Sequence, residues 1–125
     1  MRDGSREDAI RERLADITGP DPGDAERALV ARLIRSFAGK APAGAELLGE
    51  LLRGGDPETI REHAHSLKGS ASNLGASTLA RVFAEVEEAA RQGRIADPDI
   101  TLGRVAAELA LTLDVLERVA AGSGR

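Results

Sequence analysis

Several residue types are missing from the chain or rare in it: its 125 residues include no cysteine, tryptophan or tyrosine and only two phenylalanines. The absence of cysteine excludes disulfides, thiolate catalysis and cysteine-ligated zinc. Apolar runs stay well below the roughly 20 residues that a membrane span requires. Residues 1–17 are charged and contain no hydrophobic signal core. We therefore expect a cytoplasmic protein that makes no contact with a membrane.

An excess of basic residues is missing as well. The chain has 17 Lys and Arg against 21 Asp and Glu, which gives a net charge of −4. Nucleic-acid binding needs a basic face, so we expect no nucleic-acid partner. The length is that of one domain. Because aromatics are so few, its core has to be built from Ala, Leu, Val and Ile, a composition that suits packed helices.

Proline and glycine divide the chain into segments with helical periodicity. The predicted helices span about 6–17, 24–38, 43–53, 57–74, 77–93 and 98–122. The sequence GKAPAG predicts the break between the second and the third. Asp24, Asp56 and Ser77 are candidate N-caps. No segment alternates with a period of two, so the chain is predicted to be all-α, and its short connections favour an antiparallel bundle.

Both histidines lie in the segment REHAHSLKGSASNLGA at 61–76. At about 100° per residue, His63 lies about 60° to one side of the core position Ile60, and His65 about 140° to the other. Side chains about 160° apart on a helix cannot bind one metal ion. The i,i+4 spacing of a helical zinc pair is absent too. We therefore expect no metal site, and we assign no role to His63, which is expected at the surface or partly buried.

His65 shares its side of the helix with one lysine and two small residues. Ser72 lies about 20° from it, Gly69 about 40° and Lys68 about 60°. Together they place a nucleophilic imidazole and an ammonium group among small side chains, where another protein's backbone can approach. This arrangement suits a histidine that carries a phosphoryl group. A surface histidine without chemistry is the alternative that the helical wheel leaves open.

The segment AHSLKGSASNLGASTL resembles the phosphoacceptor signature of histidine-containing phosphotransfer (HPt) domains. That signature has Ala-His, a hydrophobic residue, Lys-Gly, a run of small residues, and a second Gly followed by Leu. The matching residues here are Ala64, His65, Leu67, Lys68, Gly69, Gly75 and Leu79. The resemblance covers roughly residues 22–120.

The resemblance implies an antiparallel four-helix bundle with an additional N-terminal helix. The chain then divides into a helical extension at 1–20, a single HPt domain at 21–122 and a tail at 123–125.

The resemblance also implies roles for individual residues. His65 is the expected phosphoacceptor at Nε2, Lys68 steadies the phosphoryl oxygens, and Glu87 holds the other ring nitrogen. Gly69 leaves room for the partner. Arg91 lies one turn beyond Glu87.

Three further expectations complete the predicted site. Ser72 and Gly75 are expected to belong to the surface that binds the partner or the phosphoryl group. Glu85 and Glu88 are alternatives to Glu87, because all three glutamates lie in EVEEAA. Arg91 has an alternative reading as dipole compensation at a helix C-terminus.

Nothing in the sequence provides for phosphorylation from ATP. It has no G-x-x-x-x-G-K-[ST] loop and no glycine-rich ATP lid. It also has no strand-borne acidic cluster to hold Mg²⁺, so we expect no cofactor here and Mg²⁺ only on a receiver partner. The expected partners are response-regulator receiver domains, a hybrid histidine kinase, or both, and the expected state is a monomer.

The leading interpretation is a phosphorelay intermediate without kinase activity of its own. It accepts phosphate at His65 from a receiver aspartate and passes it to another receiver. The first alternative is the phosphoacceptor domain of a chemotaxis-type histidine kinase. A helical adaptor that is never phosphorylated is the second alternative, and a metal-binding bundle is the last.

Overall fold

Residues 3–123 are described by the computed structural model of the chain. They form five helices, which are α1 (Asp3–Thr18), α2 (Asp24–Gly54), α3 (Pro57–Asn73), α4 (Ser77–Arg91) and α5 (Pro98–Ser123). No strand occurs in this range, which confirms the all-α prediction. None of the described helices has both the length and the apolar character needed to cross a bilayer.

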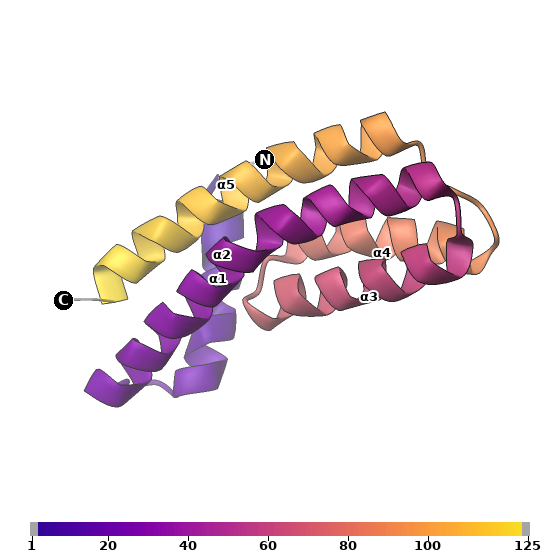
Figure 1. The fold of residues 1–125 in the computed structure, drawn as a ribbon. Helices are drawn as coiled ribbons and strands as arrows, with labels where there is room; N and C mark the ends of the chain where they lie inside the picture. The colour runs from indigo at the N-terminus through magenta and orange to yellow at the C-terminus, as the bar shows by residue number, and fades with distance from the viewer. Residues whose placement is uncertain (1–2, 124–125) are drawn as a thin grey trace.

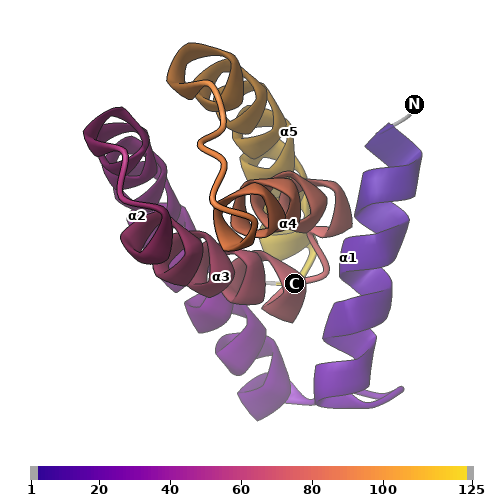
Figure 2. The same ribbon diagram turned by 90° about the vertical axis from the view of Figure 1, so that its right-hand side faces the viewer.

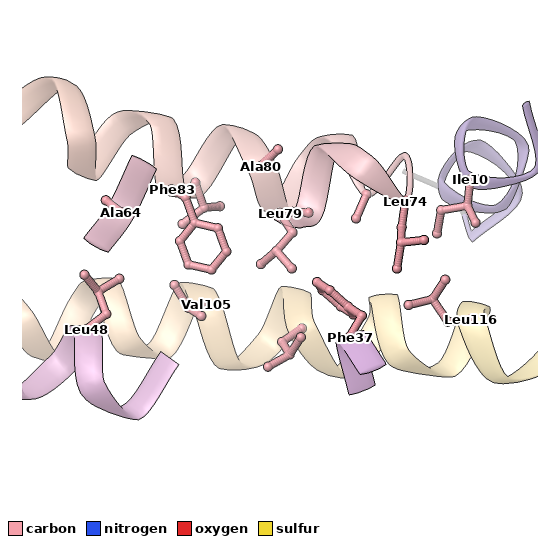
Figure 3. Close-up of a cluster of buried hydrophobic side chains, with 14 of the residues drawn as sticks. Ile10, Phe37, Leu48, Ala64, Leu74, Leu79, Ala80, Phe83, Val105 and Leu116 are labelled. Carbon is pink, nitrogen blue, oxygen red and sulfur yellow. The ribbon is translucent and has the colours of Figure 1, made fainter. Parts of the chain in front are cut away.

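Helices α2 to α5 run in alternating directions and form an antiparallel four-helix bundle (Figure 1). α2 lies along α5, and α3 and α4 form a hairpin packed against this pair. Their apolar faces enclose one core (Figure 3), in which aliphatic residues such as Leu48 and Leu79 surround the two phenylalanines, Phe37 and Phe83. The predicted bundle with an additional N-terminal helix is therefore confirmed.

The additional helix, α1, covers apolar surface that the α3–α4 hairpin is too short to reach. At 1.5 Å per residue the 31 residues of α2 extend over about 46 Å, and the 17 residues of α3 over about 26 Å. α1 crosses the bundle near the turn between α3 and α4 (Figures 1 and 2). Its Ile10 and Leu14 are buried in the common core. Its Arg6 donates two hydrogen bonds to Glu108 of α5, at 2.6 and 2.8 Å.

The predicted break at GKAPAG is wrong, because α2 continues through Pro42 as one helix. A proline inside a helix removes one backbone hydrogen bond, here the bond to the carbonyl of Ala38. Both residues are exposed, so water can satisfy that carbonyl. On the opposite face Phe37, Ala41 and Leu48 follow helical spacing into the core. Core packing on both sides of Pro42 therefore outweighs the local signal to end the helix.

Two of the predicted N-caps are one residue off. Gly23 caps α2 and Ala76 caps α4, so Asp24 and Ser77 are the first residues inside their helices. The Gly23 N–H donates to the Glu26 carboxylate at 3.0 Å, so the side chain of Glu26, and not that of an N-cap residue, forms the capping hydrogen bond at this end. The Ser77 hydroxyl is directed to the turn instead, where it donates to the Gly75 carbonyl at 3.4 Å.

Candidate functional site

Helix α3 presents His65 to solvent. The helix begins as predicted, with Asp56 as N-cap and Pro57 at its first position. Ile60 and Ala64 are buried on its inner side, and this fixes the rotation of the helix against the bundle. The side chain of His65, one residue beyond Ala64, is 65% exposed. The imidazole is therefore accessible while its backbone is held by the core.

Helix α4 brings a buried carboxylate to this imidazole. Glu87 has a side chain that is only 3% exposed, and its Oε2 lies 2.9 Å from Nδ1 of His65. A carboxylate only accepts hydrogen bonds, so Nδ1 carries the hydrogen. In the neutral ring Nε2 then holds the free lone pair. Glu87 thus selects the tautomer of His65.

The same carboxylate binds cations from both helices. Its Oε1 lies 2.7 Å from Nζ of Lys68, one turn after His65 on α3. Its Oε2 also accepts from the guanidinium of Arg91 at 3.0 Å, one turn further along α4. Arg91 binds Glu88 as well, at 2.7 Å. One buried anion therefore joins an imidazole, an ammonium group and a guanidinium group at the α3–α4 interface.

The charge of Glu87 is maintained by these neighbours. Burial by itself would raise the pKa of Glu87, because it penalises the ionised form. Hydrogen bonds from Lys68 and His65, together with the positive charge of Lys68, outweigh the burial and lower the pKa of Glu87 below its ordinary value. The group is therefore an anion at neutral pH, although it is almost completely removed from water.

A family model described as Hpt domain matches residues 32–121, most of the chain. The chain belongs to the Hpt domain family. The resemblance found in the sequence is thereby confirmed. Hpt domains carry out histidine phosphotransfer in two-component phosphorelays, and they interact with response-regulator receiver domains and with kinases. No curated protein and no solved structure gave a significant match to the chain.

The three glutamates of the Hpt chain's EVEEAA segment have different partners. Glu85 is exposed and lies 2.8 Å from Arg104 of α5. Glu88 is exposed and binds Arg91 within α4. Only Glu87 faces α3 and reaches His65. Glu87, the carboxylate expected to hold the imidazole, is therefore the one of the three that contacts it in the structure.

The remaining predicted site residues lie in two different places. Gly69 and Ser72 are exposed on α3, on the turns that follow His65. No atom lies within 4 Å of the position that a Cβ on Gly69 would take, so the space beside it is open to a partner. Gly75 lies elsewhere, in the turn between α3 and α4. Its φ is +77°, and a Cβ there would lie 2.6 Å from the Ala9 carbonyl oxygen of α1. Gly75 therefore packs against α1 and lies away from His65.

His63 belongs to a contact that the sequence did not predict. Its Nε2 lies 3.0 Å from the carbonyl oxygen of Gly44, so it donates a hydrogen bond from α3 to α2. Gly44 also permits the close approach of the two helices, since a Cβ there would lie 2.8 Å from Leu67. Among the described residues, no three His, Cys, Asp or Glu side chains gather closely enough to hold a metal ion.

Proposed function

We propose that this Hpt protein accepts a phosphoryl group on Nε2 of His65 from the phosphorylated aspartate of one receiver domain and passes it to another. The hydrogen bond between Nδ1 and Glu87 carries the proposal, because it leaves the lone pair on Nε2 of an imidazole that is 65% exposed. A partner can reach that nitrogen without any rearrangement of the bundle.

Each transfer exchanges one bond to phosphorus for another. The Nε2 lone pair attacks the phosphorus of the acyl phosphate, and the bond from phosphorus to the aspartate oxygen breaks with its electron pair. The hydrogen on Nδ1 stays in place, so the phosphorylated ring is positively charged. Glu87 balances that charge at 2.9 Å. In the second transfer the neutral imidazole leaves, and the same groups act in reverse.

Lys68 is a cation that can bind the phosphoryl oxygens. It lies on the same face of α3 as His65, its side chain is one-third exposed, and it already binds Glu87. An ammonium group has three N–H donors, so Lys68 can stay bound to the Glu87 carboxylate and still donate a hydrogen bond to a phosphoryl oxygen. The half-exposed Arg91 is a second cation at the same carboxylate. Protein groups that position and balance charge are what phosphoryl transfer chiefly requires.

The phosphate source and the metal are assigned to the partner. The sequence has no ATP-binding loop, so the phosphoryl group comes from another protein and this chain has no kinase activity of its own. Mg²⁺ is expected on the receiver side. All the groups invoked for transfer lie on the α3–α4 hairpin of one chain, so a monomer is sufficient.

Phosphotransfer from a ³²P-labelled receiver domain tests the proposal. We expect label on the wild type and on His63→Gln, and none on His65→Gln. The label should be acid-labile and base-stable, as expected of a phosphorus–nitrogen bond to histidine.

His63→Gln is the matched control, because it removes the other histidine from the same helix. Label on wild type and His65→Gln alike would move the chemistry away from His65. Label that appears only with a kinase and ATP, and never from a receiver, would favour a kinase phosphoacceptor domain. Receiver binding without label on any variant would favour an adaptor.

A further inference from the structure

A cavity of about 290 Å³ lies between α2 and α3, on a different face of α3 from His65. Both phenylalanines of the chain, Phe37 and Phe83, line it, together with Leu74 and Leu109. All four of these side chains are buried. They form an apolar floor at the centre of the bundle, where protein interiors ordinarily leave few voids larger than a water molecule.

The mouth of the cavity is polar. Ser36 and Lys40 of α2 and Ser70 and Asn73 of α3 line it, and all four are exposed. The cavity therefore opens to solvent between the two helices through a rim of hydrogen-bonding groups. An apolar floor with a few converging polar groups is the usual form of a small-molecule site.

The charge at the mouth is positive in an otherwise acidic protein. None of the described side chains that line the cavity is acidic, and Lys40 is the charged one. Within the described part of the chain, Lys40 makes no hydrogen bond or ion pair. The guanidinium of Arg13 approaches the same rim, where it donates to the Asn73 carbonyl at 3.1 Å. The rim therefore offers an unused ammonium group to an anion.

We propose that this cavity binds a free amphipathic carboxylate of medium chain length. A volume of about 290 Å³ lies at the small end of ligand sites, which hold about 300–1,000 Å³, so a ligand of this chain length suits it better than a larger one. The hydrocarbon tail lies on the floor formed by Phe37 and Phe83, and the carboxylate lies beside Lys40. This site is separate from His65 and does not depend on the proposed phosphotransfer.

Titration of the full chain with sodium octanoate, followed by the methyl NMR signals of Leu67 and Leu109, tests the proposal. We expect saturable shifts of these signals and a higher melting temperature. Octylamine has the same tail with a positive head, and we expect it to bind about two- to fivefold more weakly, the range of an exposed charge pair. Absence of shifts at these leucines, or equal affinity for the two compounds, would overturn the proposal.

Two variants assign the binding to the cavity. Lys40→Gln is expected to lower the affinity for octanoate and to remove the preference over octylamine. Arg35→Gln on the same helix is the matched control, because Arg35 does not line the cavity. Ser70→Leu is expected to fill the mouth and abolish binding. Unchanged octanoate binding by folded Lys40→Gln and Ser70→Leu would show that the compound binds elsewhere.

Discussion

At the scale of single residues, the candidate site depends on the Glu87 carboxylate. It is buried, it selects the tautomer of His65, and it also binds Lys68 and Arg91. A buried charge is tolerated only where partners compensate for the loss of water. All of these partners reach solvent, so the cluster can change its arrangement when a phosphoryl group arrives.

Replacing Glu87 by glutamine keeps an oxygen that can accept from Nδ1 but removes the negative charge. Hydrogen bonds to charged groups are worth about 1.5–3 kcal/mol, so we expect Glu87→Gln to slow phosphotransfer by about 10- to 100-fold. The measurement is the single-turnover rate from a phosphorylated receiver. Because Glu87 acts by positioning His65, the Glu87→Gln substitution should also change the pH profile of that rate.

Glu85→Gln is the control for this substitution, because Glu85 lies on the same helix but binds Arg104. We expect its rate and pH profile to match those of the wild type. Equal effects of the two substitutions would mean that the overall charge of α4, rather than the contact with His65, controls the rate.

The lowered pKa of Glu87 also makes stability depend on pH. Its ionised form stabilises the fold above the ordinary value of 4.5, and this contribution is lost as the pH falls through the lower folded value. Unfolding free energies are compared between the wild type and Glu87→Gln, so that the His65 hydrogen bond that helps to lower this pKa is kept. We expect a difference that shrinks as the pH falls below about 4.5. A difference that grows on acidification would mean that burial raises the pKa instead.

The sequence predicted some of these residue contacts and not others. The resemblance to HPt domains implied that Glu87 lies against His65, and the distance of 2.9 Å between their side chains agrees. The role of Glu87 in transfer stays a prediction. The ion pair of Lys68 with Glu87 was not predicted, because it depends on how closely α3 and α4 pack. The hydrogen bond from His63 to Gly44 was missed for a related reason, since its acceptor lies in a segment predicted as a break.

At the scale of helices, α2 shows a conflict between local and tertiary signals. Pro42 and its neighbouring glycines indicate a loop, whereas the spacing of Phe37 and Leu48 indicates one continuous apolar face. The structure follows the apolar face. Local residue preferences therefore gave the wrong boundary here, and the spacing of core residues across the proline was the better signal.

Pro42→Ala is expected to stabilise the protein. Alanine restores the backbone donor to the Ala38 carbonyl, and proline inside a helix costs about 3 kcal/mol. Because α2 already accommodates the ring and proline also restricts the unfolded chain, we expect a gain of about 1–2 kcal/mol in the free energy of unfolding. Urea denaturation measures it. Pro57→Ala, at the first position of α3, should give no such gain, and destabilisation by Pro42→Ala would contradict this account.

At the scale of the whole molecule, α1 is part of the common core. Its Ile10 is almost completely buried, and its backbone lies directly against Gly75 in the turn between α3 and α4 (Figure 3 shows Ile10 near Leu74). The sequence predicted a helix over about 6–17, in which Ile10, Leu14 and Ile17 lie on one apolar stripe. It did not predict the surface that this stripe covers, because that depends on the difference in length between α2 and the α3–α4 hairpin.

Two glycine substitutions separate the core under α1 from the exposed surface near His65. Gly75→Ala forces a Cβ to within 2.6 Å of the Ala9 carbonyl at a φ of +77°, so we expect a loss of about 2 kcal/mol or more. Gly69→Ala meets no atom of this chain and should stabilise α3 by up to about 1 kcal/mol. Thermal unfolding measures both, and effects of the same sign would contradict the assignment.

The groups of the candidate site also lie close together along the chain, since His65 and Glu87 are 22 positions apart and Arg91 follows four positions later. Contacts of such low sequence separation cost little loop-closure entropy and form early in folding. The α3–α4 hairpin can therefore assemble the His65–Glu87 pair before α1 and α5 dock. Substitutions in α1 and α5 are then expected to change the unfolding rate of the protein while the distance between imidazole and carboxylate stays the same.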